Sequence, residues 1–344
     1  MDIIKWSNES NVYESFHHAC DDAINNNKII EIDSNTIITI DNSIIIKNNS
    51  NTLIIKGISS NGNVPVIVGL GHSVFQIGGR KTSLIIDNVI INHTCNRSDK
   101  SDIGACVFGL YKSTININNC NLTSTYGFSI WAVQQCSISV SNSNICSKSR
   151  SGCVIFGKSN SIFNNVTIND CKQHGICSRG ETTVIVNNSS IINSGVRGIY
   201  GYHNVTLTMN DCIVSGTSSK NAAAVDCWSI SSTNATGIYA STTNHIHTNS
   251  YIYIVFKTEE EQRRRERMAA ADDDDGGDDD GNDSINDNSY DATGITSTNT
   301  ESTTITSIIG DISNVANTKS MLRLALTRCS IVNNNGIGVR LRTR

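Results

Sequence analysis

The residues that could support chemistry lie between positions 104 and 216, where acidic side chains are scarce. That stretch contains only three acids, Asp170, Glu181 and Asp211. Hydrolysis of a glycosidic bond by two carboxyl groups requires them to lie about 5–10 Å apart. The three acids occupy unrelated positions relative to the neighbouring cysteines and glycines, so no repeated carboxylate pair is expected.

Aromatic and guanidinium side chains follow a series of glycines in the same stretch. The fourth residue after each glycine is Phe108, Trp131, Phe156, Arg179 or Tyr202, and the residues just before three of these glycines are Tyr126, His174 and Arg197. Alternate residues of a strand face opposite ways, and the apolar residues between glycine and aromatic predict that this row faces outward. Such a row suits sugar stacking or protein contact. The opposite phase would place the row inside as an aromatic stack.

His174 and Arg179 offer another catalytic option, as a base and an anion clamp, but a single histidine is more often structural. The 12 cysteines form no Cys-x-x-Cys pair, so neither a zinc ribbon nor a disulfide framework is indicated. We therefore expect no metal, no cofactor and no catalysis, and we expect the cysteines to be thiols.

These residues are positioned by a repeat. The pattern aliphatic-x-apolar-x-polar-small-x-aliphatic recurs with third positions at intervals of 23, namely Ile117, Val140, Phe163, Val186 and Met209, with further copies at Ile86 and Leu326. Each unit holds two or three short strands of alternating polarity, separated by Asn, Ser or Gly turns. A unit this short cannot bury its apolar face alone, but stacked units form a continuous core.

With these motifs the chain resembles the right-handed parallel β-helix superfamily, the pectate-lyase-like fold, over residues 29–228 and 320–344. The resemblance implies an all-β, single-stranded right-handed parallel β-helix of ~23-residue coils with a short N-terminal capping helix. Enzymes of this superfamily use clustered carboxylates, or carboxylates with Ca²⁺ and an arginine base. The chain lacks those motifs, which favours a non-catalytic scaffold that presents a carbohydrate- or protein-binding face. A divergent polysaccharide lyase or hydrolase, and a structural fibre component, are the alternatives.

One repeat position accepts only small side chains: Cys120, Ser143, Val166, Ser189, Cys212 and Cys329. We interpret it as a packing ladder inside the coil, with its cysteines on non-adjacent coils, because buried Cys behaves as a small hydrophobe. Asparagines recur beside it, at Asn118 or Asn119, Asn142, Asn165 and Asn188, and predict an amide ladder from coil to coil.

Four regions follow from the register: an N-terminal cap (1–28), β-helix coils (29–228), an insertion (229–319) and a resumed coil (320–344). In the cap, Val12, Phe16, Ala19 and Ala23 share a helical face, and Asn11 with Glu14 would form a capping box. In the insertion, the acidic low-complexity tract 258–291 is expected to be disordered.

The register also predicts that Ser232 to Val315 loops out and that Tyr251 to Phe256 adds a strand. The last coil would then end as an open edge, discouraged from pairing by its arginines or covered by a homo-oligomer or capping partner.

Charge and hydropathy exclude other classes. The net charge is −4, and the tract around residues 259–283 accounts for its sign, so the remaining chain is too weakly basic for a nucleic-acid surface. No apolar stretch is long enough to span a membrane, and residues 1–10 lack a signal-like apolar region. We therefore expect a polysaccharide or protein ligand, and no nucleic-acid or membrane partner. We also expect a cytoplasmic location.

Overall fold

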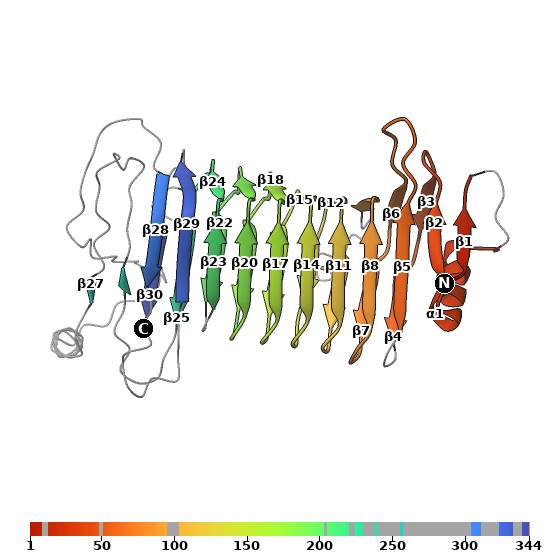
Figure 1. Cartoon of the computed structure of the whole chain (residues 1–344), viewed down its shortest axis with the longest axis horizontal. Helices are drawn as coiled ribbons and strands as arrows, with labels where there is room; N and C mark the ends of the chain where they lie inside the picture. The colour runs from red at the N-terminus through yellow and green to blue at the C-terminus, as the bar shows by residue number, and fades with distance from the viewer. Residues whose placement is uncertain are drawn as a thin grey trace, which may run out of the picture.

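The computed structural model is an elongated solenoid of stacked coils (Figure 1). It describes residues 1–8, 13–47, 51–94, 103–202, 205–219, 224–229, 238–239, 255–256, 304–310, 323–332 and 339–343. Nearly all strand pairs are parallel, and they form three ladders that run along the axis of the solenoid. The prediction of an all-β parallel β-helix with a short helix near its N-terminus is confirmed.

The first ladder contains β1 (Ile3–Trp6), β2 (Ile29–Ile32), β5 (Thr52–Gly57), β8 (Ser83–Asp87), β11 (Thr114–Asn118), β14 (Ser137–Ser141), β17 (Asn160–Asn164), β20 (Thr183–Asn187), β23 (Thr206–Asn210) and the start of β29 (Arg323–Val332). The second contains β3 (Ile37–Ile40), β6 (Val66–Gly69), β9 (Ile90–His93), β12 (Asn121–Ser124), β15 (Asn144–Ser147), β18 (Thr167–Asn169), β21 (Ser190–Ile192), β24 (Ile213–Ser215) and the end of β29. The third contains β4 (Ile44–Lys47), β7 (Ser73–Gly78), β10 (Ala105–Leu110), β13 (Phe128–Ala132), β16 (Cys153–Phe156), β19 (His174–Arg179), β22 (Arg197–Tyr202), β25 (Val225–Ser229) and β30 (Val339–Thr343).

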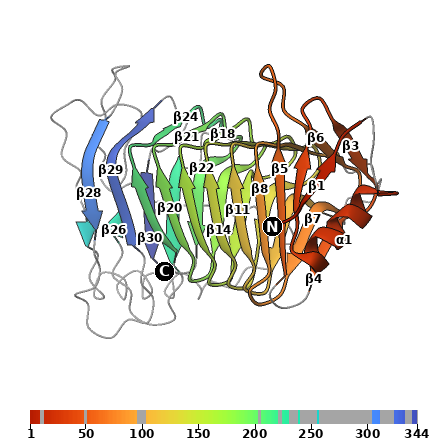
Figure 2. The same ribbon diagram turned by 45° about the vertical axis from the view of Figure 1, so that its right-hand side comes forward.

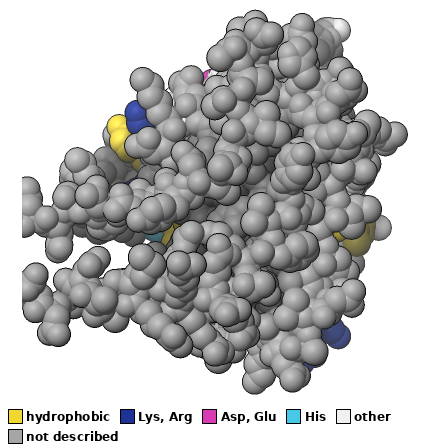
Figure 3. Space-filling view, turned by 90° about the vertical axis from the view of Figure 1, so that its left-hand side faces the viewer, with side chains coloured by type: hydrophobic (Ala, Val, Ile, Leu, Met, Phe, Trp, Pro, Cys, Tyr) yellow, Lys and Arg dark blue, Asp and Glu magenta, His cyan; other side chains and the backbone are white. Residues whose placement is uncertain are grey.

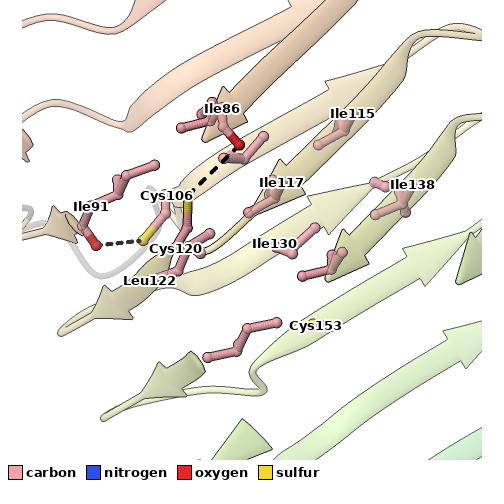
Figure 4. Packing of buried hydrophobic residues seen from close by; sticks show 14 of the residues in the cluster. Ile86, Ile91, Cys106, Ile115, Ile117, Cys120, Leu122, Ile130, Ile138 and Cys153 are labelled. Carbon is pink, nitrogen blue, oxygen red and sulfur yellow. Dashed lines mark hydrogen bonds between the residues drawn. The ribbon is translucent and has the colours of Figure 1, made fainter. Parts of the chain in front are cut away.

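Aliphatic side chains from all three ladders fill the core. In β11, Ile115 and Ile117 are buried while Thr114 and Asn116 face outward, which is the alternation that a half-buried strand requires. Figure 4 shows how the inward residues of neighbouring coils meet around two thiols. One of these thiols bonds to backbone: Cys106 Sγ donates to the carbonyl oxygen of Ile91 at 3.7 Å.

The turn between the first and second ladders explains why one repeat position takes only small residues. Asn119 and its equivalents adopt a left-handed backbone with φ near 52°, a conformation that asparagine tolerates. The next residue points inward. Ser143 Oγ there accepts from the backbone N–H of Cys120 at 3.0 Å and donates to the carbonyl of Ser141. The predicted inner ladder is confirmed, because all its members are buried.

The prediction that ladder cysteines lie on non-adjacent coils is wrong at one end. Residues 229–319 separate Cys212 from Cys329 in sequence, but β29 pairs directly with β23 and β24. These two cysteines are therefore neighbours, because the register places them side by side.

An amide ladder runs along the outside of the same turns. Asn165 Nδ2 donates to Asn142 Oδ1 at 2.9 Å, and Asn142 Nδ2 donates to Asn118 Oδ1 at 3.0 Å. A second run of amide bonds lies one residue earlier in each coil: Asn187 Nδ2 donates to Asn164 Oδ1 at 2.8 Å, and Asn210 Nδ2 donates to Asn187 Oδ1 at 2.8 Å. The amide ladder predicted from sequence thus forms, without Asn188 in these contacts.

The N-terminal end is covered by the helix α1 (Phe16–Asn26), seen in Figure 2 against the first coils. Its buried residues include Phe16, Ala19 and Ala23, while Val12 lies outside the described residues. The predicted capping box is wrong. Ser15 is the N-cap, and its side chain accepts from the backbone N–H of His18 at 3.2 Å, because the helix begins four residues later than the box requires. No helix among the described residues is long and apolar enough to cross a membrane.

The C-terminal end contains strands from the insertion, of which β28 extends the sheet. In β28 (Thr304–Gly310) the backbone pairs antiparallel with β29, and β30 pairs in parallel with β25. The prediction that Ser232 to Val315 simply loops out is therefore wrong, because part of it completes the sheet edge along β29 that was expected to stay open. The short strands β26 (Ile238–Tyr239) and β27 (Val255–Phe256) pair with each other. The tract 258–291 lies outside the described residues. Figure 3 shows the molecule from its C-terminal end.

Candidate functional site

The outward face of the third ladder carries most of the residues singled out in the sequence. The inward residues Val107, Ile130 and Ile199 are fully or almost fully buried in the core cluster. Phe108 and Trp131 do not belong to that cluster and are half-buried. The alternation therefore directs the aromatic residues away from the core.

Strand register corrects the order of the predicted row. Trp131 pairs with Val154, not with Phe156, and Phe156 pairs with Arg179. Two additional residues separate Trp131 from Phe156 relative to the 23-residue period, so the glycine landmark and the register disagree there. The third ladder therefore carries two rows: the first, called the inner row, is Phe108, Trp131, Val154, Cys177, Tyr200 and Asp226, and the second, called the outer row, contains Phe156, Arg179 and Tyr202.

Rings from adjacent coils stack in the first half of the inner row. The centroids of Phe108 and Trp131 lie 4.4 Å apart with an interplanar angle of 23°. Phe128 meets Trp131 edge-on at 5.5 Å, and His72 approaches Phe108 at 6.3 Å. Stacking between coils covers ring faces with neighbouring rings, and the Trp131 Nε1 atom is itself buried. This first aromatic cluster is therefore better suited to packing than to serving as a platform for a sugar.

The second cluster is polar and centres on Tyr200. The guanidinium carbon of Arg197 lies 4.4 Å from the Tyr200 ring centroid, and Tyr202 stacks on the same ring system at 5.1 Å. His174 approaches Tyr200 at 5.1 Å, and the guanidinium of Arg179 lies 5.1 Å from the Tyr202 ring. Cation–π contacts of this kind stabilise the guanidinium orientation by roughly 0.5–2 kcal/mol each.

A buried carboxylate holds one guanidinium of this cluster in place. Arg197 Nε lies 3.0 Å from Asp226 Oδ2, and the side chain of Asp226 is 1% exposed against 20% for Arg197. An ionised carboxylate this deep requires a charged partner. The pair therefore fixes Arg197 over Tyr200 and joins β22 to β25.

Burial changes the acid–base properties of two groups on this face. Burial, and secondly the charge of Arg197, lower the pKa of His174 to about 4, so its imidazole is neutral at pH 7. Its Nδ1 is buried and has no hydrogen-bond partner among the described residues. Burial raises the pKa of Cys177 to about 12, which keeps that thiol protonated and weakly reactive.

Phe156 and Tyr126 occupy different surroundings from the other candidates. Phe156 is half-buried on β16 next to Arg179, and among described residues no ring contacts it within stacking distance. Tyr126 is 64% exposed in the turn before Gly127, at the edge of the face. The structure thus groups Phe156, Arg179 and Tyr202 on adjacent coils and leaves Tyr126 apart from them.

Sequence reasoning missed Tyr200 and Asp226. Tyr200 lies 23 residues after Cys177 and 46 after Val154, so strict use of the period from Trp131 would have found it. Asp226 follows Tyr200 by 26 residues, and only the strand pairing of β22 with β25 aligns them.

The three acids considered for catalysis lie in turns. Asp170, Glu181 and Asp211 all have positive φ, near 50°. Asp170 accepts from the side chain of Asn193, and Glu181 forms an exposed ion pair with Lys158 at 3.1 Å. Within the described part of the chain, no group of three or more His, Cys, Asp and Glu residues could hold a metal ion.

Comparisons with known proteins agree with the architecture. A family profile described as "right handed beta helix region" matches residues 82–251. The three parallel ladders and this match together show that the chain folds as a right-handed parallel β-helix. No curated protein matches the sequence.

Two solved structures match about two thirds of the chain. An alginate lyase from Paenibacillus sp. str. FPU-7 has 11% identity and a TM-score of 0.45, over 68% of this chain and 89% of that one. The Dettilon tailspike protein has 10% identity and a TM-score of 0.32, over 66% of this chain and 55% of that one.

Proposed function

We propose that the protein is a non-catalytic scaffold whose third ladder binds an extended polysaccharide on its outward face. One observation carries the proposal: Phe156, Arg179 and Tyr202 lie in register on three adjacent coils. We call these three residues the binding row. Successive strands are about 4.8 Å apart, so a linear ligand lying along the axis meets one residue of the row after another.

The chemistry of the row suits a saccharide. Phe156 offers a ring that no other described ring covers, and an apolar sugar face packs well on such a ring. Beside it, Arg179 is exposed and supplies several donors in a fixed plane. Contact with the Tyr202 ring limits the movement of that guanidinium, which lowers the entropy lost when it binds a hydroxyl group.

The nearby acidic groups are engaged in other contacts or lie away from the face, which supports binding without catalysis. Asp226 is engaged by Arg197, and the other acids of the central coils lie in turns. No second carboxylate faces Asp226 from a described strand of this ladder. Two-carboxylate glycoside hydrolysis therefore has no support from the described face.

A second function has one specific observation in its favour. His174 is neutral at pH 7 and lies against Tyr200 and next to Arg197. A neutral imidazole beside a guanidinium has the two groups that proton abstraction next to a carboxylate uses, a base and a cation, as in a lyase that acts on uronates. A pKa of about 4 makes this imidazole a weak base, so the catalysed rate should be low. Ultraviolet absorbance of the unsaturated product, with uronate polymers as substrates and His174→Gln as the variant, tests this alternative.

A glycan array followed by titration calorimetry tests the main proposal. Wild-type protein should bind a set of related polysaccharides, and Phe156→Ala should weaken the best ligand by about tenfold, equivalent to about 1.4 kcal/mol. Tyr111→Ala is the matched control, because Tyr111 is a 59% exposed aromatic residue in a turn outside the third ladder. Absence of glycan binding by the wild type, or equal losses in the two variants, would refute the proposal and favour a protein ligand.

A further inference from the structure

Cys212 and Cys329 lie side by side at the C-terminal end of the inner ladder. Met209 pairs with Leu326, and Ile213 pairs with Ser330, so Cys212 and Cys329 occupy equivalent positions on adjacent coils. Neighbouring parallel strands are about 4.8 Å apart, which falls within the Cα separation of roughly 4.4–6.8 Å that a disulfide spans. Both side chains are buried, at 1% and 0% exposure.

No other described cysteine has a cysteine opposite it in the strand register. Cys153 lies between Ile130 and Ile176, and Cys177 lies between Val154 and Tyr200. Cys120 faces Ser143 in the same ladder. Other core thiols interact across the coil interior, as Cys171 does with Cys146 and Cys153, but among the described strands only the junction after the insertion places two cysteines at equivalent positions of adjacent coils.

We propose that Cys212 and Cys329 are a disulfide site that links the coil before the insertion to the coil after it. A low-molecular-weight disulfide, such as oxidised glutathione, is the oxidant. The thiolate of one cysteine attacks it, forms a mixed disulfide and releases one thiol. The second thiolate then attacks the protein sulfur, forms the Cys212–Cys329 bond and releases a second thiol. Two protein thiols are oxidised and one small disulfide is reduced.

The disulfide forms while the chain folds, or while the last coil is open, and not in the fully folded structure. A hydrogen bond with Cys329, and then burial, raise the pKa of Cys212. A protonated, enclosed thiol reacts slowly. The two cysteines are accessible before β29 docks on β23, and docking brings them together.

The link would hold the far edge of the candidate face in place. β29 and β30 belong to the last coil, and β30 pairs with β25, where Asp226 lies opposite Arg340. A bond between residues 212 and 329 keeps this coil attached regardless of the conformation of the residues between them. The inference rests on the fold and holds whether or not the face binds a glycan.

Refolding of the reduced full-length chain in a mixture of oxidised and reduced glutathione tests the site. Peptide mapping without reduction should show a crosslink between the peptides containing Cys212 and Cys329. Its formation should raise Tm by about 5 °C relative to the reduced protein, because the closed loop is long. Cys120→Ser, in the same ladder, should leave both the crosslink and the Tm difference unchanged.

Two results would overturn the proposal. In the first, wild-type protein that refolds under these conditions retains both thiols in alkylatable form after denaturation. In the second, Cys212 or Cys329 is mapped to another partner. The mapping uses wild-type protein, so it decides the matter even where Cys212→Ser or Cys329→Ser fails to fold. Where those variants fold, they should lose the crosslink and the rise in Tm.

Discussion

Separate removal of each partner of the Arg197–Asp226 pair should destabilise the protein by different amounts. Asp226 is 1% exposed and Arg197 is 20% exposed. In Arg197→Met the carboxylate stays buried without its countercharge, whereas in Asp226→Asn the guanidinium keeps some contact with water. The structure therefore predicts that the arginine variant is the less stable of the two.

The magnitudes follow from the burial of each group. Loss of one partner from a buried ion pair costs about 3–5 kcal/mol, so Arg197→Met should lower the free energy of unfolding by about 3 kcal/mol or more. Asp226→Asn retains an acceptor of similar shape and loses only a charged hydrogen bond, which is worth about 1.5–3 kcal/mol. The double variant should be more stable than the sum of the two losses predicts, because each single variant leaves an unmatched group.

Urea unfolding followed by circular dichroism measures these free energies. Lys158→Met is the control, since the Lys158–Glu181 pair has side chains that are 59% and 58% exposed, and such surface pairs contribute only up to about 1 kcal/mol. Equal losses in all three single variants, or losses below about 0.5 kcal/mol for both members of the buried pair, would refute the reasoning about Asp226.

Three further predictions concern other parts of the chain. The pKa of His174 is about 4 in the folded protein and about 6.5 when unfolded, so the unfolded chain binds the additional proton between these values. This histidine should therefore lower the free energy of unfolding by at most about 3 kcal/mol as the pH drops from 6.5 to 4. His174→Gln should remove that contribution and leave the slope of the same sign that comes from His93, whose pKa burial also lowers. In reduced native protein, a thiol reagent followed by mass spectrometry should modify Cys177 first among the ten described cysteines, because the other nine are buried; early modification of Cys153 would contradict the packing. Replacement of residues 258–291 by a Gly/Ser linker should leave Tm nearly unchanged, since loop-closure entropy varies slowly with length. Replacement of residues 232–315 should lower Tm because β28 leaves the edge of β29, and equal melting of the two deletions would show that β28 contributes nothing.

The repeat made the coil architecture predictable because core packing repeats with the sequence. Ile117, Val140 and Phe163 differ in size but share the inward position on adjacent strands, so periodicity alone aligned them. The small-residue ladder was also predictable, since Cys120 and Ser143 fill the same space beside the same kind of turn. The N-cap of α1 could not be predicted, because Ser15 and Asn11 both precede apolar residues at a spacing that suits an N-cap.

The candidate face was only partly predictable, because turns differ in length from coil to coil. Trp131 and Phe156 follow equivalent glycines but lie in different rows. The Tyr200 cluster depends on contacts between strands, and its carboxylate, Asp226, lies beyond an irregular turn. The side of the strand to which each residue points could be predicted from the alternation of polar and apolar residues. The contact partner of each side chain could not, because it depends on the register of the third ladder.

A crystal structure of the protein with the polysaccharide fragment that binds most tightly on the array would test the central proposal most directly. We expect density for a sugar ring packed on Phe156, with at least one of its oxygens within hydrogen-bonding distance of the Arg179 guanidinium, and with the fragment directed along the solenoid axis toward Tyr202. Density on the outward face of the first ladder, or in the turns that join the ladders, would contradict the assignment of the binding row.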